Sequence, residues 1–498
     1  NVPSLLARRI LGQQNQTLTK SLERLSTGLR INRGADDPAG LIASQNLRAE
    51  KTAINAAISN AERADQVINV AEGGLAEVSS LLTELEGLVD KSANDAGLSS
   101  EEKDANQLQI DSILQTIDRI ANSTNFQEIK LLNGNFDYTT SGVDTDSVNE
   151  SKGNAAGIAD DAKVDVAVQM VTSAQTGKVF MAAASGGDLD FGGGGTITIE
   201  VAGNKGSQQF SFTSGATGSD VVQSINNFTE SLGVSATLST LTGDGSGVGQ
   251  QSSGLIFNST DYGENQFVSV KIINGDSLVD AAEDAVGNLD GTAEAEGDSF
   301  KDVGRDATVI INGTEATTDG LTARVASTSL DLEINLDATN FNTDGDTDSF
   351  SITGGGATFQ LSPKLDLAGK ASLGLPAVTT GQLGSITNGF LSNVKAGGSA
   401  NVVTGDVDNA QSIVRDAIRQ VSTLRGRLGA FQKNTVGATI RSLGVSLENT
   451  SAAESQIRDT DFAEQTASLT RSQILVNAAT NVLSIANSQP QNVLALLG

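Results

Sequence analysis

The residues able to carry out chemistry in this chain are carboxylates, Lys, Tyr, Ser and Thr, because its 498 residues include no Cys, His or Trp. The missing Cys and His exclude thiol nucleophiles, imidazole bases and the common soft-metal sites. Without Cys there is no disulfide, so the redox compartment cannot be read. The sequence therefore predicts no catalytic residue, no bound metal and no cofactor, and an enzyme is the least favoured class of protein.

Carboxylates in close succession are the remaining candidates for acid–base or metal chemistry. They occur as Asp36–Asp37, Asp459/Asp461, Asp144/Asp146 and Asp344/Asp346/Asp348. The first two pairs fit better as caps of helices that begin beside them. The last two groups lack the Gly and distal Glu of an EF-hand loop, so solvated acidic loops are favoured over calcium sites. Carboxylates alone could serve a glycosidase, but no aromatic pocket residues accompany any pair.

The element that must organise the chain is a long amphipathic helix over residues 41–92. Its apolar residues alternate spacings of three and four: Ile54, Ala57, Ala61, Ala64, Ile68, Ala71, Leu75, Val78, Leu82, Leu85 and Val89. This 3.5-residue repeat is typical of a helix that packs along a partner helix. Asp37 followed by Pro38 predicts the N-cap and first helical position. At 1.5 Å per residue the helix is roughly 75 Å long.

A second run of the same kind supplies the partner. It consists of Val414, Ala417, Val421, Leu424, Leu428, Phe431, Thr435 and Ala438. Ser99–Glu102 predicts the capped start of another helix, which folds back on residues 54–89 and completes a bundle. The two halves of the chain are therefore expected to meet as a helical core.

The chain ends extend this theme. A heptad stripe in residues 4–30 contains Leu11, Leu18, Leu22, Leu25 and Leu29, and another near the C-terminus contains Leu469, Val476 and Leu483, with Val493 and Leu496 assigned to the same surface. No charged residue occurs from Ser472 to Gly498. Such a helix exposes apolar surface as a monomer, so we expect it to be buried between identical chains, with its amides facing a polar lumen.

The middle of the chain has a different pattern of residues from the two ends. After about residue 140, β-branched runs alternate with Gly, Asp and Ser clusters, which predicts strands. A helix is expected over 220–232, a hairpin turn at Asn133-Gly134, and hinges at Gly192–Gly195 and Gly354–Gly356. The expected fold is α+β and multidomain: a long coiled-coil and helical-bundle core built from both termini, with a mainly β insertion.

Charge is unevenly spread along the chain. Residues 1–60 contain eight Lys or Arg and four Asp or Glu, a net charge of +4. Residues 411–498 contain eight and six, a net charge of +2, so residues 61–410 carry −34 against −28 for the whole chain. An acidic middle suits a solvated outer surface and argues against nucleic acid or an anionic membrane as a partner. No apolar run reaches 18 residues, and the first residues do not have the pattern of a signal peptide.

Two long motifs lie near the ends of the chain, within residues 21–41 and 452–497, and through them the chain resembles the bacterial flagellins. Ser21–Asn32 with Asp36–Leu41 resembles the N-terminal signature of that family, with Pro38 in place of the usual Ala. Ala452–Glu464, Gln473–Leu475 and Gln489–Leu497 resemble its C-terminal signature. The resemblance covers roughly residues 1–140 and 400–498.

This resemblance implies an extracellular filament subunit for swimming motility, which is exported unfolded through the flagellar secretion channel. It implies an inner coiled-coil domain (1–40 and 452–498), a helical-bundle core domain (41–160 and 356–451) and an outer variable insertion (161–355). Its implied partners are copies of itself, the filament cap, the hook–filament junction protein, and the export chaperone and secretion apparatus.

One pair of positions departs from the family. Flagellins sensed by the animal Toll-like receptor use an Arg on the long helix and a Glu on the next helix, and the corresponding positions here hold Glu86 and Thr116. The reversed charge and the lost carboxylate argue against recognition by that receptor.

Other classes of protein remain as alternatives. A hook–filament junction protein has similar ends, although the C-terminal motif favours the filament subunit. An exported adhesin with a ligand-binding middle is the other alternative. Flagellins that carry a zinc protease need His-Glu-x-x-His, which a chain without His cannot provide.

Overall fold

The computed structural model describes residues 2–94, 97–156, 163–183, 196–213, 216–241, 252–274, 279–282, 297–327 and 330–497. The chain divides into two compact units, each assembled from segments far apart in the sequence. Unit 1 comprises residues 1–69, 359–371 and 426–498, and unit 2 comprises residues 70–358 and 372–425. The long helix α2 (Pro38–Ser92) contributes to both units.

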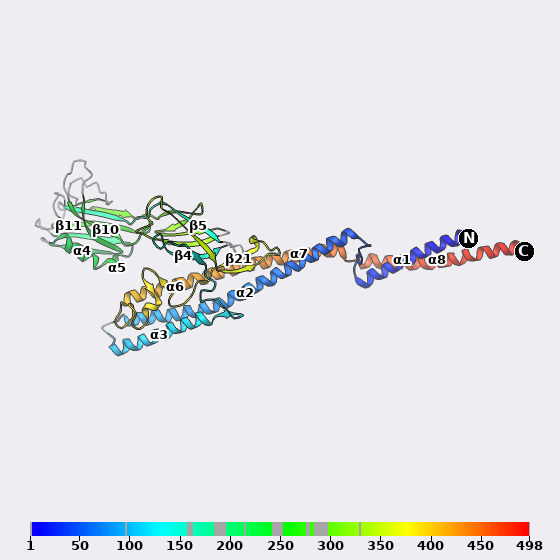
Figure 1. Cartoon of the computed structure of the whole chain (residues 1–498), viewed down its shortest axis with the longest axis horizontal. Coiled ribbons are helices and arrows are strands. Elements are labelled where there is room, and N and C mark those ends of the chain that lie inside the picture. The colour runs from blue at the N-terminus through cyan, green and yellow to red at the C-terminus, as the bar shows by residue number, and fades with distance from the viewer. Residues whose placement is uncertain are drawn as a thin grey trace. The chain divides into compact units, whose positions relative to one another are not determined.

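The two chain ends lie together in unit 1 (Figure 1). Helices α1 (Val2–Thr27) and α8 (Phe462–Leu497) run antiparallel, since Leu29 and Asp459 form an antiparallel bridge and Ser4 bonds to Asn487 at the other end. Helix α1 ends because Gly28 adopts a φ of +72°, the left-handed conformation that commonly terminates helices. The expectation of a coiled coil built from both termini is confirmed.

Helix α2 is longer than the periodicity alone predicted, with 55 residues. It starts at Pro38, where the Asp37 Oδ1 atom accepts a 2.9 Å hydrogen bond from the backbone N–H of Gly40. The carboxylate thereby satisfies one of the N–H groups that a helix start leaves without a partner. Proline at the first helical position loses no hydrogen bond.

The C-terminal helical run contains a π turn. Helices α6 (Val407–Ala430) and α7 (Gly437–Arg458) are joined through Phe431–Val436, where the N–H of Gly437 bonds to the carbonyl of Gln432. The spacing of α6 predicts a continued stripe at Thr435 and Ala438. The buried positions are instead Val436, Leu443 and Thr450.

Each buried position of α7 therefore comes one residue later than the unbroken repeat requires. A π turn holds one residue more than an α turn, so it absorbs this offset and returns the apolar side chains to the buried face. The predicted continuation through Thr435 and Ala438 is wrong for this reason.

The bundle of unit 2 combines the C-terminal half of α2, helix α3 (Ser100–Ser123) and the part of α6 up to residue 425 (Figure 1). The Ser99 and Glu102 side chains form the expected capping box at the start of α3. The short elements of unit 2 outside the sandwiches are β1 (Asn125–Phe126), β2 (Ile129–Lys130), β22 (Gly384–Ser385), β23 (Gly389–Phe390) and η2 (Leu391–Val394). The 3-10 turn η1 (Leu367–Gly369) belongs to unit 1, and β20 (Ala357–Gln360) and β21 (Lys370–Leu373) include residues of both units.

The hairpin expected at Asn133-Gly134 lies elsewhere. Strands β1 and β2 pair antiparallel, and the turn between them is made by Gln127 and Glu128, with φ values of 51° and 70°. These residues carry the positive φ values of a type I′ turn without the Asn-Gly sequence that usually marks it. Asn133-Gly134 does lie in a turn, closed by a hydrogen bond from the N–H of Asp137 to the carbonyl of Gly134, but it is not a hairpin, because its flanks bond to Leu375 and Val378 and not to each other.

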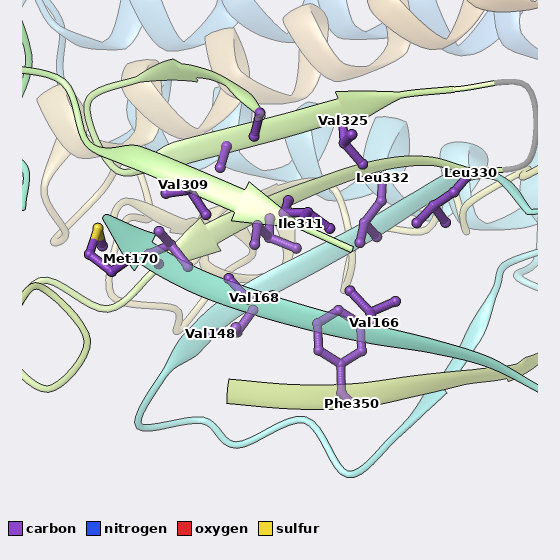
Figure 2. Packing of buried hydrophobic residues seen from close by; sticks show 14 of the residues in the cluster. Val148, Val166, Val168, Met170, Val309, Ile311, Val325, Leu330, Leu332 and Phe350 are labelled. Carbon is purple, nitrogen blue, oxygen red and sulfur yellow. The ribbon is translucent and has the colours of Figure 1, made fainter. Parts of the chain in front are cut away.

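The first β-sandwich of unit 2 packs a five-stranded sheet against a four-stranded sheet. The five-stranded sheet has the order β15 (Thr314–Glu315), β14 (Thr308–Ile311), β5 (Val164–Thr172), β19 (Thr347–Gly354), β3 (Thr139–Ser141). The four-stranded sheet has the order β16 (Thr317–Asp319), β17 (Thr322–Ala326), β18 (Leu330–Leu336), β4 (Val148–Ala156). Val166, Val168 and Met170 alternate inward from β5 and meet Leu332 of the facing sheet (Figure 2). Strands β3 and β4 precede residue 161, so the sandwich begins before the predicted insertion does.

The second β-sandwich also lies in unit 2. One sheet has the order β12 (Val279–Ala282), β6 (Lys178–Ala183), β10 (Ser252–Ser259), β9 (Val234–Leu241). The other has the order β13 (Ser299–Val303), β11 (Phe267–Asn274), β7 (Ile197–Gly203), β8 (Ser207–Phe212). The single helix expected over 220–232 is two helices, α4 (Gly218–Asn226) and α5 (Thr229–Leu232), broken at Asn227 and Phe228. Val221, Ile225 and Leu232 still reach the same core.

Two of the expected hinge glycines, Gly355 and Gly356, sit against Tyr138. Both have positive φ values, of 94° and 75°. A Cβ atom on Gly356 would lie 2.5 Å from the Tyr138 ring, so the close approach itself requires glycine there. The other expected hinge, Gly192–Gly195, lies outside the described residues.

Candidate assembly surface

The seam between α1 and α8 is narrow and built from small residues. On α8 the buried positions recur every seven residues, at Gln465, Ser472, Ala479 and Ala486, and the half-buried Leu469, Val476 and Leu483 lie between them. Ala7 and Ser21 are the buried residues of α1. A heptad seam in which every second position is Ala, Ser or Gln buries little apolar area, so this pair of helices is weakly held within one chain.

The outer faces of the same two helices carry large apolar side chains in water. They are Val2, Leu5, Leu6, Ile10 and Leu22 on α1, and Phe462, Ile474, Leu475, Val482 and Ile485 on α8. Val2 is 77% exposed, and Ile474 and Ile485 are each 62% exposed. Single exposed apolar side chains are common on soluble proteins, but ten large ones on one pair of helices favour a contact with another molecule. We call these ten side chains the terminal apolar faces.

The predicted terminal heptad residues divide between the two surfaces. Leu11, Leu18, Leu25, Leu469, Val476 and Leu483 are half-buried, whereas Leu22 is 50% exposed and belongs to the terminal apolar faces. Leu29 lies beyond α1 and forms the bridge to Asp459. The side chains of Val493 and Leu496 lie outside the described residues.

The predicted core stripe is buried within the single chain. Its members in α2 and α6 are Ile54, Ile68, Leu75, Val78, Leu82, Leu85, Val89, Val414, Val421, Leu424 and Leu428. Phe431 is half-buried, and its ring lies 6.3 Å from the ring of Phe359 within unit 1. A side chain that is already enclosed cannot contact a second copy, so these residues hold the bundle and leave other surfaces for assembly.

Ion pairs beside this stripe were not predicted. In unit 2, Arg425 bonds to Glu72 at 2.8 Å and Arg415 to Glu86 at 3.1 Å, while Gln411 bonds to Asp90 at 2.6 Å. In these three pairs the residue numbers rise along α2 while they fall along α6, so the two helices run antiparallel. Only a known register could have revealed these pairs, because the sequence contains many other combinations of charged residues.

The two positions that depart from the receptor-binding pattern are both engaged within the chain. The Glu86 carboxylate pairs with Arg415. The Thr116 hydroxyl donates to the carbonyl of Ser112 at 2.9 Å and accepts from Arg119 at 3.4 Å. Neither position offers the charge that the family pattern requires.

A long loop between β21 and α6 is fastened to the bundle of unit 2 by polar side chains. Asp118 of α3 accepts hydrogen bonds from the backbone N–H and hydroxyl of Thr380, at 2.8 and 2.9 Å, and pairs with Lys395. The buried Gln107 amide donates to the carbonyl of Val394 and accepts from the N–H of Val402. The sequence signal for this role was weak: Gln107 is a polar residue at a helical spacing otherwise taken by apolar ones.

The carboxylate pairs serve as local caps. Asp461 Oδ1 accepts from the N–H of Ala463 at 2.8 Å at the start of α8. Asp36 accepts from the N–H groups of Arg33 and Asn32, and these hydrogen bonds, that from Arg33 foremost, hold the pKa of the Asp36 carboxyl below its ordinary value. Among the residues the structure describes, no group of acidic side chains is arranged to hold a metal ion.

Within the described parts of the chain, no helix is both long enough and apolar enough to span a bilayer.

Comparison with known proteins assigns both ends of the chain. Residues 1–137 match the bacterial flagellin N-terminal helical region, and residues 411–497 match the bacterial flagellin C-terminal helical region. Flagellin of Clostridium tyrobutyricum is 27% identical over 491 residues, covering 97% of this chain and 97% of that protein. Flagellin of Salmonella typhimurium is 27% identical over 521 residues, covering 100% of this chain and 98% of that protein. Among solved structures, FliC of Burkholderia pseudomallei has 14% sequence identity and a TM-score of 0.24, with 74% of this chain and 99% of that chain covered.

Proposed function

The chain belongs to the bacterial flagellin family and is a structural subunit of the flagellar filament, and from this premise we propose that its terminal apolar faces are the surfaces that polymerise. The observation that carries the proposal is the set of ten exposed apolar side chains on α1 and α8. The proteins of this family are structural, and the chain is not an enzyme.

Energetic reasoning supports assembly through these faces. Burying a Leu, Ile, Val or Phe side chain contributes about 1.5–3 kcal/mol, so ten partly exposed ones contribute on the order of 10 kcal/mol. Association itself costs about 4–15 kcal/mol. A single contact therefore barely suffices, and each subunit must contact several neighbours at once, as it does in a helical polymer.

The absence of charge from Ser472 to Gly498 fits the same role. A charged side chain enclosed between copies would be desolvated at a cost of several kcal/mol. The Asn, Gln, Ser and Thr residues of α8 can instead face a hydrated central channel. In this proposal residues 1–40 and 452–498 form the inner domain of the filament.

The rest of the chain takes the outer positions. Residues 41–160 and 356–451 form the helical-bundle domain in the proposed division, except that β3 and β4 belong to the first sandwich, and residues 161–355 form the rest of the outer insertion. The acidic sandwiches face solvent, where mutual repulsion keeps neighbouring filaments apart. Neither nucleic acid nor a membrane is a partner in this proposal.

The proposed partners beyond other copies follow from family membership. They are the filament cap at the growing end, the hook–filament junction protein at the base, and an export chaperone that delivers the unfolded chain to the secretion apparatus. A chain without Cys folds outside the cell with no disulfide to form. The flagellar filament is extracellular, so export precedes assembly.

We propose also that the animal Toll-like receptor does not recognise this chain. Its long helix presents Glu86, already paired with Arg415, where recognised flagellins present an Arg. An approaching carboxylate would meet a like charge there.

The experiment that tests the proposed function is electron microscopy of the purified chain. The protein is heated mildly, cooled at neutral pH and supplied with ammonium sulfate. Hollow filaments of regular diameter support the filament role of the terminal faces. Persistent monomers with folded sandwiches would instead favour a junction protein that needs a partner to order its ends.

A further inference from the structure

The two units carry opposite net charge. Unit 1 contains 16 Lys or Arg and 12 Asp or Glu, a net charge of +4, and the whole chain has −28, which leaves −32 for unit 2. Copies of this chain therefore repel one another through unit 2 in most orientations. A cationic site on unit 1 can turn that repulsion into attraction if it meets the acidic unit of another copy.

Unit 1 contains a polar pocket with this character, of about 470 Å³. It lies where α7 ends and the early turns of α2 pass, and its lining includes Arg48, Lys51 and Asn55 of α2 with Glu454, Arg458 and Asp459. We call it the cationic pocket. Three cations and two carboxylates line it.

The carboxylates inside the cationic pocket leave its positive charge only partly neutralised. Arg48 and Lys51 share the single carboxylate of Glu454, each at 3.6 Å. Asp459 accepts a 2.6 Å hydrogen bond from the Ser455 hydroxyl at the end of α7. One carboxylate is thus divided between two cations at distances longer than a strong ion pair.

Arg458 adds the second observation. Its Nε atom is buried and has no hydrogen-bond partner among the described residues. The Arg458 side chain as a whole is only half-buried, so a second copy would contact its accessible part and not the enclosed Nε atom. The Arg30 guanidinium donates to the carbonyl of Ile457 at 2.6 Å and places a further positive charge beside this end of α7.

We propose that the cationic pocket receives a carboxylate from unit 2 of a second copy of this chain, and that the resulting ion pair orients subunits during filament growth. This inference rests on the proposed function, since it requires the chain to polymerise. The terminal apolar faces supply non-directional attraction, whereas a charge-assisted hydrogen bond to Arg458 and Lys51 fixes which orientation is accepted.

The test measures elongation of wild-type filament seeds by added monomers. Variants Lys51→Gln and Arg458→Gln should raise the critical monomer concentration about tenfold at low salt, the effect of losing one desolvated ion pair. The matched control is Arg63→Gln, an exposed arginine on the same helix outside the pocket, which should change the critical concentration by less than about twofold. The loss should shrink as sodium chloride rises.

A second measurement guards against a variant that simply misfolds. A photoreactive benzoyl-phenylalanine at Asn55 should crosslink, in filaments but not in monomers, to an acidic peptide of unit 2 from another copy. Crosslinks confined to one chain, or pocket variants that elongate like Arg63→Gln, overturn the proposal. Wild-type filaments forming in the same experiment keep this failure separate from a failure of the proposed function.

Discussion

The hydroxyl of Ser4 donates a 2.7 Å hydrogen bond to Oδ1 of Asn487, a residue 483 positions away. This bond joins the outer ends of α1 and α8, where the seam is made of small residues and half-buried ones. Within one chain the two helices thus depend on a few polar contacts and little apolar area. Their stable state requires neighbours.

Deleting Ser472–Gly498 should abolish polymerisation and leave the sandwiches folded. The deletion removes the whole uncharged part of α8, including the exposed Ile474 and Ile485, but no residue of unit 2. Sedimentation and electron microscopy report assembly, and far-UV circular dichroism reports the retained strands. Normal filaments from the truncated chain would show that the terminal apolar faces are not the polymerising surface.

Point substitutions should separate the buried stripe from the exposed faces. Leu82→Asp and Leu85→Asp each place a charge at a site with 0% exposure, which should lower the free energy of unfolding by more than about 3 kcal/mol and block assembly through misfolding. Ile474→Ser and Ile485→Ser should change the free energy of unfolding by less than about 1 kcal/mol and still block assembly. Denaturant titration of monomers and electron microscopy distinguish the two cases. Equal loss of monomer stability in both pairs would refute the division.

Acid should loosen the connection between α1 and α2. The folded-state pKa of Asp36 is lowered, chiefly by the hydrogen bond from the Arg33 N–H. A depressed folded pKa means that the carboxylate stabilises the connection at pH values above its ordinary pKa, and that this stabilisation is lost as pH falls below that value. Asp36→Asn should therefore be less stable than wild type at neutral pH and converge with it in acid. Hydrogen exchange of the amides of residues 28–37 checks this, and a difference that persists at low pH would contradict it.

How far the sequence predicts this structure depends on whether the pattern is local. The periodic stripe of α2 and its Asp37 start could be read directly, because both depend on neighbours in sequence. The contacts of Gln107 with Val394 and Val402 could not be predicted, because they join segments almost 300 residues apart and the loop that contains both valines has no periodic pattern. The pocket around Arg458 depends in the same way on the register of α7 against α2, which composition does not determine.

The π turn is the clearest case in which a periodic pattern misled. The stripe of α6 extrapolates through Thr435, yet the chain contains one residue more than an unbroken helix can accommodate, and Val436 is buried in its place. Neither segment is irregular by itself. Only the phase between Leu428 and Leu443 differs from the heptad repeat.

This phase offset yields a sharp prediction about single-residue deletions. Removing the exposed Asn434 should turn Phe431–Val436 into an ordinary α turn and keep Val436, Leu443 and Thr450 on the buried face. The free energy of unfolding should then stay within about 1 kcal/mol of wild type. Removing the equally exposed Thr423 from α6 should rotate one side of the helix out of phase, expose Leu424 or the residues before it, and lower the free energy of unfolding by more than about 3 kcal/mol. Thermal unfolding followed by circular dichroism compares the two deletions. If both prove equally damaging, the π turn is not a phase correction but a structure required for its own side-chain contacts, such as those of Gln432 with Asp65 and Asn69.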